Sequence, residues 1–163
     1  MRSIDLNSDL GEGAGADDEI MAAITSANIA CGAHAGDVET MRRSVASAVR
    51  GGVAIGAHPG YRDPASFGRV ALDMPRSALF ADLVAQIEGL QGIADEAGSR
   101  VTHVKAHGAL YNRGERDPEI AAVIADAART VGADLVVFAP SGSAMAAAAA
   151  ALGLRVAREG FAD

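Results

Sequence analysis

The stretch VTHVKAHGALYN, residues 101–112, decides how this chain folds. It opens with a short run that is rich in branched side chains, as expected of a β-strand. Successive side chains of a strand point to opposite sides, so His103 and Lys105 share one side and Val104 lies on the other. A second base, His107, follows where the strand ends. Acid/base side chains at the carboxyl end of a strand are typical of active sites in β/α folds.

Five further segments resemble this strand, and amphipathic helical patterns separate them. Such alternation predicts repeated β/α units around a parallel sheet. The predicted strands are residues 3–7, 26–31, 53–57, 101–105, 135–139 and 154–157. No linker divides the chain, so we expect one domain over residues 1–163. Six units exceed what an open three-layer sheet requires and fall short of an eight-stranded barrel, which indicates an unusual barrel or a fragment.

Capping residues mark three helices and leave one long loop. An acidic or proline residue opens each helix and a glycine follows its end, as is common at helix termini. Residues 58–74 show no periodicity and predict a long loop after the third strand, a frequent place for function. The three helices begin after Asp37, Pro75 and Asp117 and end near Gly52, Gly98 and Gly132.

Composition excludes several classes of protein. Half of the 163 residues are hydrophobic, enough for a real core, and the net charge of -7 opposes binding to nucleic acid or anionic lipid. No apolar run approaches the roughly 20 residues that a membrane span needs. A single cysteine, Cys31, rules out an intrachain disulfide and is expected to be a small buried residue. We therefore expect a cytoplasmic protein.

Polar residues recur on one side of the predicted strands. A parallel sheet covered on both faces normally has apolar strands throughout, so these positions need a polar environment such as a barrel lumen. They either form a structural hydrogen-bond network or line an active site, and we favour the network because unpaired buried polar groups are costly. The positions are Asp5, Ser26, Asn28 and His103.

The ends of the strands gather most of the acid/base residues. Imidazole and carboxylate groups move protons near neutral pH, and a lysine stabilises an oxyanion or a phosphoryl group. The same groups also bind divalent metals, but no compact H-x-x-x-H or H-E-x-x-H spacing supports a metal site. No phosphate-binding glycine loop or nucleophile elbow is present. The residues are Asp9, Glu12, His34, Asp37, His58, Lys105 and His107; Asp37 is also explained as a helix cap.

Five blocks in this order resemble the LamB/YcsF family. They are DLNSDLGE (residues 5–12), SANIACG (26–32), HAGD (34–37), GAHPGY (56–61) and VKAHGALYN (104–112), and the resemblance extends to FAD (161–163). It departs from the family pattern at Ala33 and Ala106, where the family has an aromatic residue and a proline.

The resemblance implies a seven-stranded β/α barrel related to polysaccharide deacetylase-like barrels. This chain, with about six strands, is then expected to be incomplete at its C-terminus. The implied activity is ATP-dependent hydrolysis of 5-oxo-L-proline to L-glutamate by a multi-subunit 5-oxoprolinase. ATP is then a co-substrate, with Mg²⁺, and no cofactor is tightly bound. The implied partners are the B and C subunits, which resemble allophanate hydrolase.

On this resemblance we assign site residues and keep two alternatives. One alternative is a metal-dependent deacetylase or amidohydrolase acting on a carbohydrate or amide, and the other is a non-catalytic assembly subunit. No metal ligand is predicted. The predicted catalytic residues are Asp9, Glu12, Lys105 and His107, and the predicted substrate-binding residues are Asn7, His34, Asp37, His58, Tyr111 and Asn112.

Overall fold

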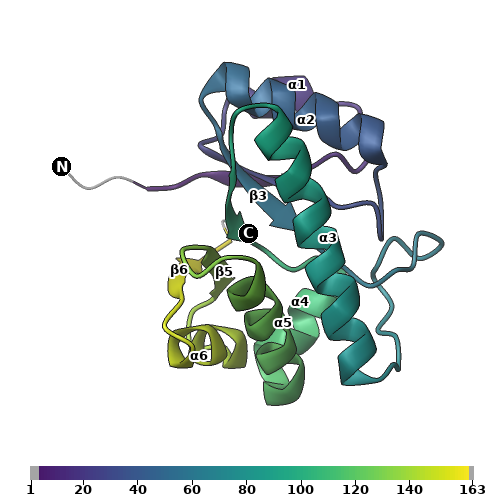
Figure 1. Ribbon diagram of the computed structural model, residues 1–163, viewed down its shortest axis with the longest axis vertical. Helices are drawn as coiled ribbons and strands as arrows, with labels where there is room; N and C mark the ends of the chain where they lie inside the picture. Colours follow the sequence, from purple (N-terminus) through teal and green to yellow (C-terminus); the bar gives the residue numbers. More distant parts are fainter. Residues whose placement is uncertain (1–3, 162–163) are drawn as a thin grey trace.

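Six short parallel strands form a single sheet in the computed structural model, which describes residues 4–161 (Figure 1). Each strand pairs with the next along the chain, and the sheet curls into a half-barrel, so the predicted α/β fold is confirmed. The strands are β1 (Asn7–Leu10), β2 (Ser26–Ala30), β3 (Ala54–His58), β4 (Val101–Val104), β5 (Val136–Pro140) and β6 (Arg155–Glu159).

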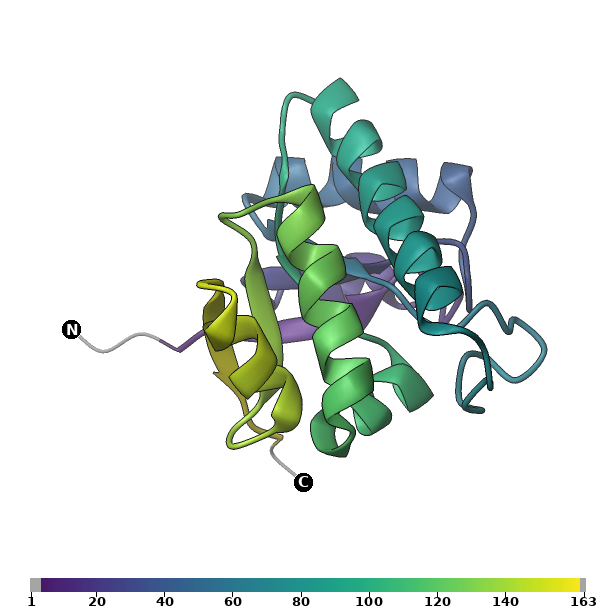
Figure 2. The same ribbon diagram turned by 60° about the horizontal axis from the view of Figure 1, so that its bottom comes forward.

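Helices form a continuous layer beside the sheet, in which α3 contacts both α2 and α5, and α5 contacts α6 (Figure 2). Helix α3 buries a stripe of leucine and isoleucine side chains at helical spacing, which supplies much of the apolar core. None of the helices within residues 4–161 has the length and apolarity of a membrane span. The helices are α1 (Asp17–Met21), α2 (Val38–Gly51), α3 (Arg76–Glu96), α4 (Gly108–Arg116), α5 (Pro118–Val131) and α6 (Ala144–Ala151).

The capping residues read from the sequence open and close the helices as expected. The Asp37 carboxylate accepts a hydrogen bond from the Thr40 amide at 2.8 Å, and Gly52 ends α2 with a φ of 66°. Helix α5 starts in the same way, because Asp117 accepts bonds from two amides of its first turn. Side chains that satisfy free backbone amides thus fix where both helices begin.

The first strand lies further along the chain than predicted. The alternation of Ile4 and Leu6 with polar residues favoured a strand over residues 3–7, but β1 begins at Asn7, and Ser3 is outside the described residues. Ile4 is 90% exposed and Leu6 56% exposed, so neither packs in the core. Asp5 instead accepts side-chain hydrogen bonds from residues that precede or begin β2. The alternation therefore reflected a tethered edge segment and not a buried strand.

Candidate functional site

The carboxyl ends of β1 to β4 bring the predicted acid/base residues together inside the curl of the sheet. His34 and His58 are about 1% exposed, and Lys105 and His107 are 7% and 6% exposed. Two carboxylates from the end of β1 and the following loop, Asp9 and Glu12, reach into the same cluster. The convergence predicted from the strand ends is confirmed for these six residues.

Lys105 links both edges of the sheet through its ammonium group. Its Nζ lies 3.2 Å from Asp9 Oδ1 and 3.3 Å from Asn7 Oδ1 on β1, and 2.8 Å from Glu159 Oε1 on β6. An ammonium group has three hydrogens, so these contacts use all of its donors. Tyr111 completes the group by donating a hydrogen bond to Glu159 Oε2 at 2.8 Å.

The buried side-chain amide of Asn28 holds the two β1 residues that contact Lys105. Asn28 donates to Asn7 Oδ1 at 2.8 Å and to Asp9 Oδ1 at 2.9 Å, and its own oxygen lies 3.0 Å from His103 Nε2. Gly56 on β3 leaves room for His103, because a Cβ there would collide with its ring. The predicted polar residues therefore do form structural hydrogen bonds, in two pairs: Ser26 with Asp5, and Asn28 with His103. Asn28 also positions Asn7 and Asp9.

Glu12 lies at the centre of the histidines. Its Oε1 is 3.0 Å from His34 Nε2, 3.1 Å from His107 Nδ1 and 3.5 Å from His58 Nε2. One ligand atom from each of these four residues lies within 4.8 Å of all the others, so the set could hold a metal ion. The three histidines lie at the ends of three different strands, which is why no local spacing in the sequence signals such a set.

Backbone carbonyls orient two of the histidine rings. His58 Nδ1 lies 2.7 Å from the Lys105 carbonyl oxygen, and His107 Nε2 lies 2.8 Å from the Phe67 carbonyl oxygen. Carbonyl oxygens only accept, so both of these ring nitrogens donate. Phe67 has a φ of 55°, a strained conformation in the predicted long loop that aims its carbonyl at His107.

Both carboxylates are ionised at neutral pH. Burial alone raises the pKa of Asp9, but its hydrogen bond with His58 and the charges of His58 and Lys105 outweigh burial and lower the pKa below its usual range. Burial likewise opposes ionisation of Glu12, whose hydrogen bonds with His107 and His34 lower its pKa to about 2. The cluster therefore holds two negative charges beside buried imidazoles.

The sequence matches the LamB/YcsF family over residues 4–163. The chain belongs to the LamB/YcsF family. It is 48% identical over 166 residues to proteins from Bordetella pertussis and Bordetella parapertussis that are named as the A subunit of 5-oxoprolinase. These matches cover 99% of this chain and 66% of each relative, so the chain spans about two thirds of their length. A solved structure described as a lactam utilization protein from Thermus thermophilus superposes with a TM-score of 0.94 at 38% identity, covering 98% of this chain and 67% of that one.

Two residues in blocks shared with the LamB/YcsF family lie outside the cluster. Asp37 caps α2 and lines a cavity that adjoins the cluster at Glu12, and Asn112 is an exposed residue of α4 that takes no part in the contacts described above. Tyr111, from the same block as Asn112, joins the cluster through Glu159. The sequence does not point to Glu159, because the predicted sixth strand ends at residue 157, whereas β6 extends to Glu159.

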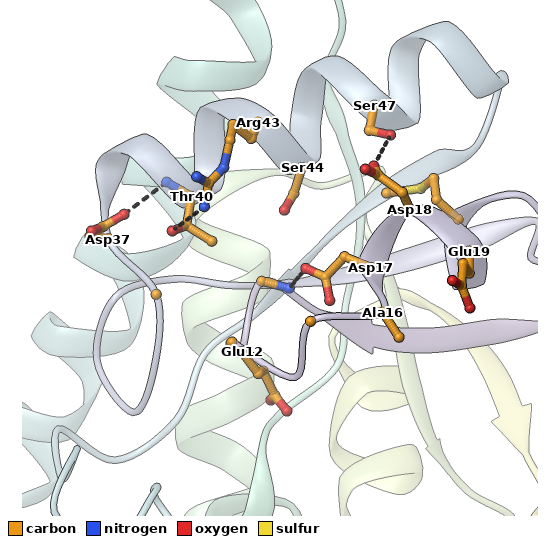
Figure 3. A pocket seen from close by; sticks show the side chains of 15 residues that line it. Glu12, Ala16, Asp17, Asp18, Glu19, Asp37, Thr40, Arg43, Ser44 and Ser47 are labelled. Atoms are coloured by element: carbon orange, nitrogen blue, oxygen red, sulfur yellow. Dashed lines mark hydrogen bonds between the residues drawn. The ribbon is translucent and has the colours of Figure 1, made fainter.

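A cavity of about 820 Å³ lies between α1, α2 and the loop after β1 (Figure 3). Three of its five acidic residues have structural partners: Asp17 accepts from the Gly11 amide, Asp37 from the Thr40 amide and Asp18 from the Ser47 hydroxyl. Figure 3 shows Glu12 pointing away from the other labelled carboxylates. Size alone therefore does not make this cavity the reactive site of the LamB/YcsF fold.

Proposed function

We propose that this chain acts as the A subunit of an ATP-dependent 5-oxoprolinase, which hydrolyses 5-oxo-L-proline to L-glutamate while ATP is cleaved to ADP and phosphate. Membership of the LamB/YcsF family and 48% identity to proteins named as the A subunit of 5-oxoprolinase support this proposal. ATP is a co-substrate in this proposal, and the expected compartment is the cytoplasm, where ATP is available. The partners proposed are the B and C subunits, which resemble allophanate hydrolase.

The observation that carries the proposal is a buried ammonium group close to buried proton carriers. Asp9 connects the two, because its Oδ1 lies 3.2 Å from Lys105 Nζ and its Oδ2 lies 3.3 Å from His58 Nε2. Opening a lactam places negative charge on the carbonyl oxygen and requires a proton for the leaving nitrogen. A fixed cation and nearby imidazoles supply both needs.

The proposed roles follow from these contacts. Lys105 stabilises charge on the carbonyl or phosphoryl oxygen. That oxygen would replace Asn7, which is the uncharged and the most distant of the three oxygen partners described for Lys105. Glu12 and His107 transfer protons, while Asp9 holds Lys105 in place. The remaining contacts to substrate are proposed for Asn7, His34, His58 and Tyr111.

The charged side chains that line the cavity beside the cluster do not attract ATP. Five carboxylates and a single arginine, Arg43, line the large cavity, and this excess of negative charge repels phosphate groups. Mg²⁺ bound to the nucleotide reduces that repulsion, which is why we include it with ATP. Lys105 is the buried cation of the described cluster, so it is where a transferred phosphoryl group would be stabilised.

ATP-dependent release of glutamate from 5-oxoproline, by this chain mixed with the B and C subunits, tests the proposal. Removing the charge with Lys105→Met should lower the rate by at least about 100-fold, the effect of losing a charge-stabilising donor. Arg43→Met, which removes the arginine of the adjoining cavity, is the matched control and should stay within about threefold. Full activity of Lys105→Met would indicate that the chain is a non-catalytic assembly subunit. The chemistry would then be carried out by its partner subunits.

A metal-dependent deacetylase or amidohydrolase is the second candidate, because Glu12 and three histidines gather in one cluster. Two-histidine, one-glutamate sets that bind zinc and activate water are known in hydrolases. This candidate predicts release of acetate from an N-acetylated sugar by the chain alone, without ATP and sensitive to a chelator. ATP-dependent glutamate release that resists a chelator would exclude it.

A further inference from the structure

Three side chains present metal-ligand atoms at the separations that a small cation needs. Glu12 Oε1 lies 3.1 Å from His107 Nδ1 and 3.5 Å from His58 Nε2, and the two nitrogens are 3.0 Å apart. Tetrahedral ligands bound about 2.0 to 2.1 Å from zinc lie about 3.3 to 3.4 Å from one another. The triangle therefore has the dimensions of one face of a tetrahedral site.

The hydrogen bonds of the two histidines aim lone pairs at the centre of this triangle. His58 and His107 each donate their outer ring nitrogen to a backbone carbonyl, of Lys105 and Phe67 respectively. A neutral imidazole carries one ring hydrogen, so both inner nitrogens are acceptors and face each other at 3.0 Å. Two such lone pairs beside a carboxylate require a shared cation, which is either a proton, as in the hydrogen bonds of these rings with Asp9 and Glu12, or a metal ion. Histidine ligands of metals typically show this arrangement, with the second nitrogen bonded to a carbonyl.

His34 has a different role from the other two histidines. Its ring is parallel to that of His107, with an interplanar angle of 2° and centroids 3.6 Å apart. An imidazole lone pair lies in the plane of its ring, so two stacked rings cannot both direct lone pairs at one ion between them. His34 Nε2 instead bonds Glu12 Oε1 at 3.0 Å, which fixes the carboxylate.

We propose that Glu12, His58 and His107 bind one divalent transition-metal ion, of the zinc type, with His34 positioning the Glu12 carboxylate. Two imidazoles and one carboxylate favour Zn²⁺ or Co²⁺ over Mg²⁺, which prefers oxygen ligands. Three protein ligands leave a fourth position for water or substrate, as in catalytic sites. Asp9 Oδ2, 3.3 Å from His58 Nε2, adds negative charge beside the ion. The site goes beyond the proposed lactam hydrolysis and does not depend on it.

Direct metal binding by the full chain tests this proposal. After treatment with a chelator, Co²⁺ titration should give visible absorption bands of a low-symmetry site that saturate at one equivalent and disappear when Zn²⁺ is added. Glu12→Gln, His58→Gln and His107→Gln should abolish the bands. His34→Gln should weaken binding about 10- to 100-fold, as for residues that orient a ligand. His103→Gln, a buried histidine that faces Asn28 and not the cluster, is the matched control and should bind normally.

Several outcomes would overturn the site. If the folded chain bound no metal, or if the Glu12, His58 and His107 variants bound it as well as the parent, the proposed metal site would be disproved. A proton shared between the imidazoles would then explain their contact. A loss with His34→Gln as complete as with His58→Gln would disprove the three-ligand assignment. Thermal unfolding shows whether each variant folds. If a histidine variant does not fold, Glu12→Gln still tests the metal site, because glutamine has nearly the size of glutamate and replaces it in a loop. Metal binding without glutamate release would refute only the proposed function, and glutamate release by a chain that binds no metal would refute only this site.

Discussion

The histidine cluster and the acidic cavity adjoin at Glu12, which belongs to both, and their other side chains show that carboxylates serve different purposes in the two regions. In the cavity, Asp17, Asp18 and Asp37 each bond an amide or hydroxyl that fixes a loop or helix (Figure 3). In the cluster, Glu12 is shared by three imidazoles. Carboxylates with single neutral partners are explained by structure, whereas one that several bases share is poised to exchange a proton or bind a cation.

Substitution of Glu12 should have the largest effect and sharpen this contrast. Glu12→Gln keeps the size of the side chain but removes the charge shared by the histidines, so ATP-dependent glutamate release should fall about 100- to 10,000-fold, the range for a lost acid/base group. Glu19→Gln, in the cavity wall, is the matched control and should change the rate by less than about threefold. If both variants retained full activity, the histidine cluster would not be the reactive site.

Removal of Lys105 should cost stability as well as activity. Lys105→Met leaves the Glu159 carboxylate, whose side chain is 5% exposed, without its cation. Leaving one partner of a buried ion pair uncompensated destabilises by about 3 to 5 kcal/mol, and we expect the lower end because Asp9 is 36% exposed. Urea unfolding measures this loss. Adding Glu159→Gln to Lys105→Met should recover part of it, and no recovery would mean that the lysine acts through packing alone.

His103 should make the fold sensitive to acid. Burial lowers its pKa to about 4, below the usual value near 6.5, so the unfolded chain binds a proton that the native chain excludes. Stability is then unaffected above about pH 6.5 and falls between pH 6.5 and 4, by about 2 kcal/mol at pH 5. Unfolding measured at pH 7 and pH 5 should show a smaller difference in His103→Gln than in the parent chain. An equal difference would assign the acid sensitivity to other groups.

The sequence predicted those features that depend on local chemistry and strand parity. Asn28 and His103 were placed on one polar side of their strands, and they do bond across the sheet. The shift of β1 was not predictable from the alternation of residues 4–7, because only pairing with β2 decides where an edge strand starts. Glu159 was missed for a related reason: its partner Lys105 lies 54 positions earlier, and only the curl of the sheet brings β6 to β4 and β1. The Phe67 carbonyl has no sequence signal, since it depends on a loop conformation.

The smallest expected effect concerns Asp37, which both the strand-end pattern and the family resemblance placed near the ligand. In the structure it caps α2 through the Thr40 amide. Asp37→Ala should therefore lower the free energy of unfolding by about 1 kcal/mol, the usual cost of a lost N-cap, and Asp37→Ser should restore most of it. Asp117→Ala, at the cap of α5, should cost at least as much, because Asp117 also accepts a hydrogen bond from Arg113. Glutamate release by Asp37→Ala should stay within about twofold of the parent at temperatures where both are folded. A tenfold loss under those conditions would return Asp37 to the ligand site and join the cavity to the cluster as one functional region.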